Sequence, residues 1–174
     1  MKTIQAPLSK EDVMGLTVGE TVLVNGTIYT ARDAAHQRMA AAIEAGDKLP
    51  FDPQGQVIYY TGPSPAPPGR VIGSAGPTTS GRMDIYAPLL IERGLRVMIG
   101  KGERNQAVKD AMCKHGAVYL ATVGGAGAYL ARRIIAATVA AYPELGPEAV
   151  YRLEVRDFPC IVAIDARGND IYER

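Results

Sequence analysis

Short stretches of alternating or clustered apolar residues, separated by glycine, proline and asparagine, run along most of the chain. Residues 20–25 (ETVLVN) alternate and are rich in β-branched side chains, which predicts a strand. Asn25-Gly26 is typical of a two-residue hairpin turn, so Ile28 and Tyr29 are expected to begin a return strand. Further short strands are expected over residues 57–60, 96–99, 118–123, 151–155 and 161–165.

Helical spacing first emerges after this strand pair. Thr30 is a good N-cap and Asp33, three residues later, supplies the acid of a capping box, which predicts a helix over about 31–45. Its apolar side chains recur at every fourth position, at Ala35, Met39 and Ile43. Further helices are expected over 86–93, over 105–115 and from 124 to about 141.

The order of these elements predicts the fold class. The first third is rich in strands and the remainder alternates between strands and helices, which favours an α/β fold with a mixed sheet and helices packed on it. The proline-rich segment 61–70 cannot form a helix or a central strand and is expected to be an irregular loop. With 174 residues the chain suits one domain, 1–174.

Composition excludes several classes of function. The formal net charge is +1, so no global field attracts nucleic acid or a membrane surface. No apolar run approaches the roughly 20 residues needed to cross a bilayer, and the first 15 residues lack the apolar region of a signal peptide, so a cytoplasmic protein is expected. The two cysteines, Cys113 and Cys160, are too few for a four-thiolate metal site.

Two glycine-rich motifs resemble nucleotide-binding signatures, but each lacks residues that its signature requires. Gly76 and Gly81 have P-loop spacing, but Arg82-Met83 follow where a lysine and a hydroxyl residue are needed. The run Gly125-Ala126-Gly127 lacks the last glycine of a dinucleotide fingerprint, because Leu130 stands there. Close packing of a helix start on the preceding strand is the favoured interpretation of that run, and carboxylate binding at a helix start is left open.

Polar and cationic residues gather at the expected turns and strand ends. Arg32 lies in the first turn of a predicted helix, Arg82 in the polar run 76–84, and Lys101 between two glycines after a predicted strand. Each alone is more typical of a solvated surface residue. Together they are the set that a small dicarboxylate would need, because arginine grips a carboxylate bidentately and lysine acts as a point charge.

The ordered motifs of the chain resemble the β subunit, or C-terminal domain, of class I fumarases and L-tartrate dehydratases. The matching segments are TARDAAH (30–36), VIYYTGP (57–63), GRVIGSAGPTTSGRMD (69–84), IGKG (99–102), CKHGAVYLATVGG (113–125), EVRDFP (154–159) and GND (168–170). The resemblance implies a swivelling β/β/α domain and reversible addition of water to a small dicarboxylate, with fumarate and malate first and tartrate second.

The resemblance also implies a cofactor and a partner. In this family three cysteines of the α portion bind a four-iron four-sulfur cluster, and Cys113 and Cys160 match no such ligand pattern. The cluster is therefore expected on a partner α subunit, with no metal ligand in this chain. Homodimerisation is left open, and the alternative function is a free-standing dicarboxylate-binding module without catalysis.

Roles for individual residues follow from the resemblance. The expected catalytic residues are Thr78, for proton transfer at the substrate carbon, Lys101 and Asp84. The expected substrate-binding residues are Arg32, Thr79, Gly81 and Arg82. Asp33 and His36 are expected to orient them.

Overall fold

The computed structural model describes residues 1–122 and 125–173. Its strands are β1 (Lys2–Ala6), β2 (Thr21–Thr30), β3 (Val57–Tyr59), β4 (Val97–Gly100), β5 (Val118–Ala121), β6 (Ile134–Ala141) and β7 (Val150–Ile164). They form one seven-stranded sheet in the order β1-β2-β3-β4-β5-β7-β6. Strands β1 to β5 are parallel, and β7 is antiparallel to β2, β5 and β6. Because β2 pairs with both β3 and β7, the central part of the sheet closes on itself.

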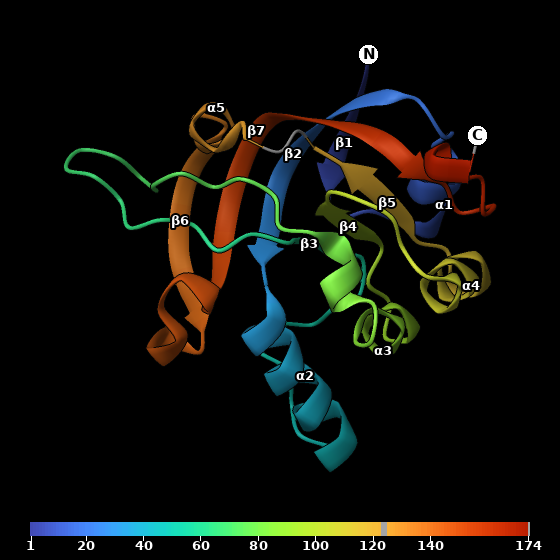
Figure 1. The fold of residues 1–174 in the computed structure, drawn as a ribbon, viewed down its shortest axis with the longest axis horizontal. Coiled ribbons are helices and arrows are strands. Elements are labelled where there is room, and N and C mark those ends of the chain that lie inside the picture. Colours follow the sequence, from blue (N-terminus) through green and yellow to red (C-terminus); the bar gives the residue numbers. More distant parts are fainter. Residues whose placement is uncertain (123–124, 174) are drawn as a thin grey trace.

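The helices of the described residues are α1 (Lys10–Met14), α2 (Asp33–Ala45), α3 (Ala87–Glu92), α4 (Gln106–His115) and α5 (Gly127–Ala131). Short 3₁₀ turns are η1 (Ser80–Met83), η2 (Pro143–Glu148) and η3 (Ile171–Glu173). Figure 1 shows α2, α3 and α4 together on one side of the sheet and α5 next to the start of β6. The predicted α/β class with a mixed sheet is confirmed.

Alternating side chains of the central strands supply two apolar cores. Val97 and Ile99 of β4 belong to a cluster that also contains Val22, Val57 and Phe158. The intervening Met98 points to the other face, into a cluster with residues of α2, α3 and α4 such as Met39, Leu90 and Met112. Both faces of the parallel strands are buried, which is why they appear in the sequence as short continuous apolar runs.

The predicted hairpin at Asn25-Gly26 is wrong, because β2 continues through it to Thr30. Gly26 pairs with Ala6 of β1 and with Val155 of β7, next to an irregularity in the register. Its φ is 101°, and an added Cβ would lie 2.5 Å from the Ala6 carbonyl oxygen. Glycine is required here by a bulge and a close backbone approach. The prediction failed because Asn-Gly is equally typical of a hairpin turn.

The helix over 31–45 is confirmed as α2, but its predicted cap is wrong. The N-cap position is Arg32, which makes no side-chain cap bond. The Thr30 hydroxyl instead accepts a hydrogen bond from the Tyr151 amide, 3.1 Å away. The Ala34 amide in the first turn is bound by the Glu148 carboxylate at 3.1 Å, a partner distant in sequence.

The long helix predicted from 124 to about 141 is wrong over most of its length. Residues 123 and 124 lie outside the described part, α5 ends at Ala131, and residues 134–141 form β6. Alanine favours helices, but this segment also carries β-branched Ile134, Ile135, Thr138 and Val139. Pairing with β7 along its length overrides the alanine preference.

The two strands predicted over 151–155 and 161–165 are one strand, β7. It bends at Asp157, whose φ is 51°, so that its first half pairs with β6 and its second half with β5. Strand β1 and helix α1 have no counterpart among the predicted elements.

The remaining predicted elements correspond to β3, β4, β5, α3 and α4. Their predicted boundaries differ from the observed ones by no more than two residues. The proline-rich segment 61–70 is an irregular, largely exposed loop, as predicted, and Figure 1 shows the loop after β3 reaching past β6. Among the described residues, no helix has the length and apolar character needed to cross a membrane.

Candidate active site at the carboxyl edge of the parallel strands

The carboxyl ends of β2, β3 and β4 bring three segments of the chain to one edge. Arg32 follows β2 by two residues, Tyr60 follows β3 and Lys101 follows β4. The Thr78 amide donates to the Tyr60 carbonyl oxygen at 2.7 Å, and the Ser80 amide donates to the Lys101 carbonyl oxygen at 2.9 Å. Thr79 forms a parallel bridge with Lys101. The polar run 76–84 is thus fastened beside the ends of β3 and β4, where parallel-strand folds often bind ligands.

Arg32 reaches this edge from the start of α2. Its side chain lies against Gly62, where an added Cβ would sit 2.9 Å from Arg32 Cδ and Nη1. Its Nε is buried and has no hydrogen-bond partner. No carboxylate within the described ranges forms an ion pair with Arg32. A buried donor without an acceptor costs about 1–3 kcal/mol, so this guanidinium is suited to an incoming anion.

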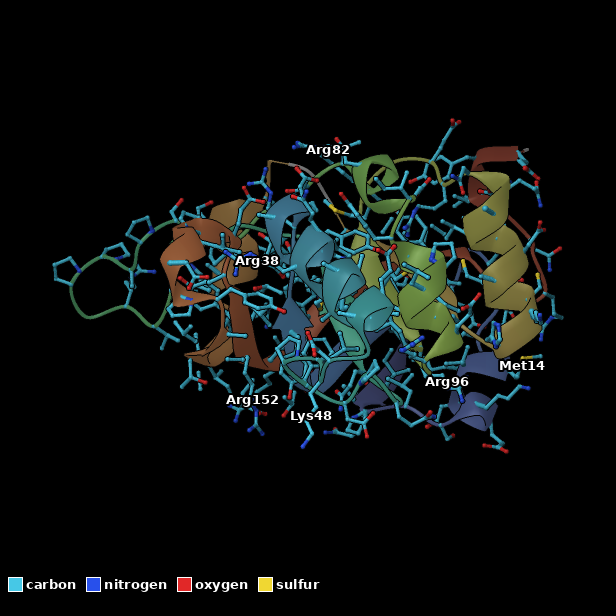
Figure 2. The ribbon with its side chains drawn as sticks, turned by 90° about the horizontal axis from the view of Figure 1, so that it is seen from below. Met14, Arg38, Lys48, Arg82, Arg96 and Arg152 are labelled. Carbon is cyan, nitrogen blue, oxygen red and sulfur yellow. The ribbon has the colours of Figure 1, made fainter. Side chains whose placement is uncertain are left out.

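Arg82 and Asp33, both chosen from the sequence, form an ion pair that joins η1 to the first turn of α2. The Arg82 side chain remains 54% exposed. Figure 2 shows it at the surface on the side where α2 begins. The pair leaves the other donors of the guanidinium available, while Asp33 restricts its direction.

Lys101, Thr79 and Gly81 are exposed at the same edge, and Thr78 is half-buried. Lys101 forms no ion pair with any residue of 1–122 or 125–173. Arg32 and Lys101 are therefore cations without an ion-pair partner in the described part of the chain, and they lie after β2 and β4 at the edge to which the segment with Thr78 is fastened.

Asp84 is held in a buried ion pair with Arg104, a residue that the sequence did not single out. Arg104 Nε lies 2.6 Å from Asp84 Oδ1, and the Asn105 amide donates to Asp84 Oδ2 at 2.7 Å. Both acceptor oxygens of Asp84 are thus engaged, and only 7% of the residue is exposed. This geometry suits a structural or orienting carboxylate.

Two tyrosine rings enclose the Arg104 guanidinium. Its Cζ lies 5.2 Å from the Tyr60 ring centroid and 4.8 Å from that of Tyr119, and Nη2 donates to the Tyr60 hydroxyl at 3.1 Å. Burial favours the neutral form of Arg104, but Tyr60 and Asp84 outweigh it, so the pKa of Arg104 is raised. No sequence pattern marks an arginine as buried. The burial of Arg104 follows from the packing of Tyr60, Asp84 and Tyr119 around it, which is seen only in the folded structure.

His36 lies on the buried face of α2. Its Nδ1 is 2.8 Å from the Arg32 carbonyl oxygen, which can only accept, so Nδ1 carries the proton. Burial lowers the pKa of His36 to about 4, against the stabilising effect of this hydrogen bond. At neutral pH His36 is therefore uncharged and ties its ring to the backbone of Arg32, as an orienting residue would.

The thiols of this chain do not fit an iron–sulfur cluster. Cys113 is exposed on α4, Cys160 is buried on β7, and both are free. Burial raises the pKa of Cys160, which opposes the thiolate that a metal requires. In the part of the chain that is described, no group of three or more His, Cys, Asp or Glu side chains is arranged to hold a metal ion.

In the second glycine run, Gly127 packs closely on residues 74–76, where the polar run 76–84 begins. An added Cβ at Gly127 would lie 2.2 Å from Ser74 Oγ and 3.0 Å from the Gly76 amide nitrogen. The Ala75 amide donates to the Gly127 carbonyl oxygen at 3.2 Å. This contact fastens the start of the run 76–84, so the glycine serves packing, as favoured from the sequence, against a different neighbour.

Comparison with known proteins agrees with the motifs at this edge. The model of the family described as fumarase C-terminus matches residues 2–174. The chain is 43% identical over 176 residues to the anaerobic class I fumarate hydratase of Escherichia coli K12, covering 100% of this chain and 31% of that protein. It is 41% identical to fumarate hydratase 2 of Leishmania major, covering 98% of this chain and 31% of that protein.

A third relative is of similar length to this chain. It comes from Methanocaldococcus jannaschii and carries the provisional name L(+)-tartrate dehydratase subunit beta. Identity is 42% over 172 residues, covering 95% of this chain and 88% of that protein. The chain thus spans about a third of the fumarate hydratases and most of the beta subunit. It belongs to the fumarase C-terminus family.

Proposed function

We propose that this chain is the β subunit, or the equivalent portion, of a hydro-lyase that reversibly adds water to a small dicarboxylate. Fumarate and malate are the first candidate substrates and tartrate is the second. The chain would supply carboxylate-binding and proton-transfer groups to a site completed by an α subunit.

The observation that carries this proposal is the state of Arg32. Its buried Nε lacks an acceptor, and its charge lacks a carboxylate partner among the described residues. A substrate carboxylate would satisfy both needs at once, through a bidentate pair. Arg82, directed by Asp33, would bind the same ligand from η1. Two carboxylates of one small molecule account for two arginines better than a single anion does.

Thr78 is the proposed proton-transfer residue, because its backbone is fixed to Tyr60 at the same edge of the sheet as Arg32 and Lys101. Removing a proton next to a carboxylate builds negative charge on that carboxylate. A fixed cation such as Lys101 then stabilises the transition state more than the ground state. Nearby positive charge also favours the ionised hydroxyl that Thr78 would need as a base.

The iron–sulfur cluster is proposed to reside in the α subunit, because the two thiols here do not fit one. The name of the M. jannaschii relative, a subunit beta, supports a two-chain assembly. The length of the fumarate hydratases, about three times that of this chain, supports the same division within a single protein.

Reconstitution tests the proposal. The chain is produced alone and together with a candidate α subunit from the same organism, under anaerobic conditions, and hydration of fumarate and dehydration of malate and tartrate are measured. We expect activity from the brown, oxygen-sensitive complex and none from the colourless single chain. An iron-free single chain with full activity would contradict the division of labour, and a loaded complex inactive on all three substrates would contradict the function.

The alternative, a binding module without catalysis, makes a different prediction for the isolated chain. Calorimetry with fumarate, malate and tartrate should give weak binding if this is half of a site. Tight binding without an α subunit would favour the binding module.

A further inference from the structure

Two segments that carry proposed site residues are connected below the surface by a buried polar network. One is the segment 78–84, with Thr78 and Arg82, and the other is the segment 101–105, with Lys101. Both lie at the carboxyl edge of the sheet, and each touches the other through its backbone at Ser80 and Lys101. Side chains beneath them add two further links.

The first link is the hydroxyl of Tyr119, on β5. It lies 2.8 Å from the Gly102 carbonyl oxygen and 2.8 Å from Ser80 Oγ. The carbonyl can only accept, so Tyr119 donates to Gly102 and the Ser80 hydroxyl donates to Tyr119. The Tyr119 hydroxyl oxygen therefore joins Gly102, which follows Lys101, to Ser80, which is two residues after Thr78.

The second link is the ion pair of Asp84 and Arg104. Asp84 is the C-cap of η1, and its two oxygens accept hydrogen bonds from Arg104 Nε at 2.6 Å and from the Asn105 amide at 2.7 Å. The two links thus hold the segments at both ends, and the Arg104 guanidinium packs on the Tyr119 ring between them.

The space around the first link is filled. An added Cβ on Gly100, the last residue of β4, would lie 2.0 Å from Ser80 Oγ. Ser80 is fully buried, and its backbone amide is already bonded to Lys101. The Ser80 hydroxyl has a defined position, so a change at Tyr119 is transmitted to the segment and not absorbed by empty space.

We infer that Tyr119, through its hydroxyl, is a positioning residue that sets Thr78 relative to Lys101. This inference rests on the proposed function for the meaning of that alignment, and on the hydrogen bonds for the alignment itself. A base and a cation that act on neighbouring atoms of one substrate must keep their separation, and a displacement of about 1 Å can lower turnover by about a hundredfold. Tyr119 acts through Ser80 and Gly102 and needs no contact with substrate.

The test uses Tyr119→Phe and Ser80→Ala in the reconstituted complex. Tyr119→Phe removes one oxygen and keeps the ring that packs on Arg104. We expect kcat to fall at least tenfold while KM changes less than twofold. Ser80→Ala should have a smaller effect because the bond to Gly102 remains, and the double variant should match Tyr119→Phe alone. The control is Tyr29→Phe, whose ring stacks on Phe51 with centroids 4.1 Å apart, outside this network.

Hydrogen exchange gives a readout independent of turnover. The Ser80 amide, bonded to Lys101, should exchange at least tenfold faster in Tyr119→Phe, and the Val162 amide, bonded to Glu20 in the sheet, should not change. The positioning role would be overturned if the Tyr119→Phe complex kept both the kcat and the Ser80 amide exchange rate of the wild type. It would also be overturned if the losses of kcat in the two single variants added up in the double variant. An inactive wild-type complex would instead contradict the proposed function, and the two failures are thus distinguishable.

Discussion

The Asp33 carboxylate accepts a hydrogen bond from the Arg82 guanidinium, so a residue of helix α2 directs a residue of η1 that is 49 positions away. Both side chains keep substantial contact with solvent, at 54% for Arg82 and 31% for Asp33. Exposed ion pairs contribute about 0–1 kcal/mol to stability. Orientation of Arg82 toward the edge that contains Arg32 and Thr78 is therefore the more consequential effect of this pair.

Replacing Asp33 with asparagine should disturb binding more than folding. We expect KM of the reconstituted complex to rise about three- to tenfold, with the free energy of unfolding changed by less than about 1 kcal/mol. Steady-state kinetics and urea unfolding measure the two effects. Glu144→Gln is the matched control, because Glu144 pairs with Arg38 farther along α2 at 2.9 Å. Equal KM values in the two variants would argue against orientation by Asp33.

Thr78→Ala should lower turnover with little effect on binding. Loss of a general acid–base group reduces rate by about 10²- to 10⁴-fold, so we expect at least a hundredfold lower kcat with KM within about threefold of wild type. The backbone bond from Thr78 to Tyr60 remains, and so the fold should be retained. Thr138→Ala on the exposed face of β6 is the control. A Thr78→Ala complex with wild-type turnover would refute the assignment.

Arg32→Lys should weaken substrate binding although the charge is kept. Lysine cannot make the bidentate pair, and a hydrogen bond to a charged group contributes about 1.5–3 kcal/mol. We therefore expect KM to rise about ten- to a hundredfold, and the affinity for a non-reactive dicarboxylate to fall in parallel, measured by calorimetry on the complex. Arg38→Lys on the same helix should leave both unchanged. Full affinity in Arg32→Lys would mean that the orphaned Nε has another purpose.

His36 should make stability depend on pH in the acidic range. Burial lowers its pKa from 6.5 to about 4, so the folded state binds the proton less readily than the unfolded state. Its contribution is present above pH 6.5 and is lost as pH falls from 6.5 toward 4, by up to about 3 kcal/mol. Urea midpoints measured at intervals between pH 7 and pH 4 follow this loss.

A pair of substitutions isolates the histidine. His36→Gln should flatten the decline relative to wild type, because the titrating group is gone, while carboxylates contribute equally to both proteins. His115→Gln, at the end of α4, replaces the other histidine of the chain and should keep the wild-type profile. Parallel curves for His36→Gln and wild type would show that another group causes the decline.

The sequence was sufficient for elements whose local signals agree with their surroundings. The helix predicted over 105–115 is α4, and in the structure the Asn105 side chain caps its start by accepting a hydrogen bond from the Val108 amide at 3.0 Å. The short apolar runs 57–60 and 96–99 are strands because both of their faces are buried. Motifs that carry the family resemblance likewise pointed to Arg32, Thr78, Arg82 and Lys101, and the folded chain brings these positions to one edge.

Tertiary structure decided everything that depends on contacts between distant segments. Residues 134–141 are rich in alanine, and pairing with β7 makes them a strand. Gly26 would suit a turn, and its neighbours Ala6 and Val155 place it inside β2. Arg104 carries no sequence signal because its burial arises from Tyr60, Asp84 and Tyr119, which lie 44, 20 and 15 positions away in the chain. Local pattern records the preferences of a segment, whereas burial and partner choice are properties of the assembled whole.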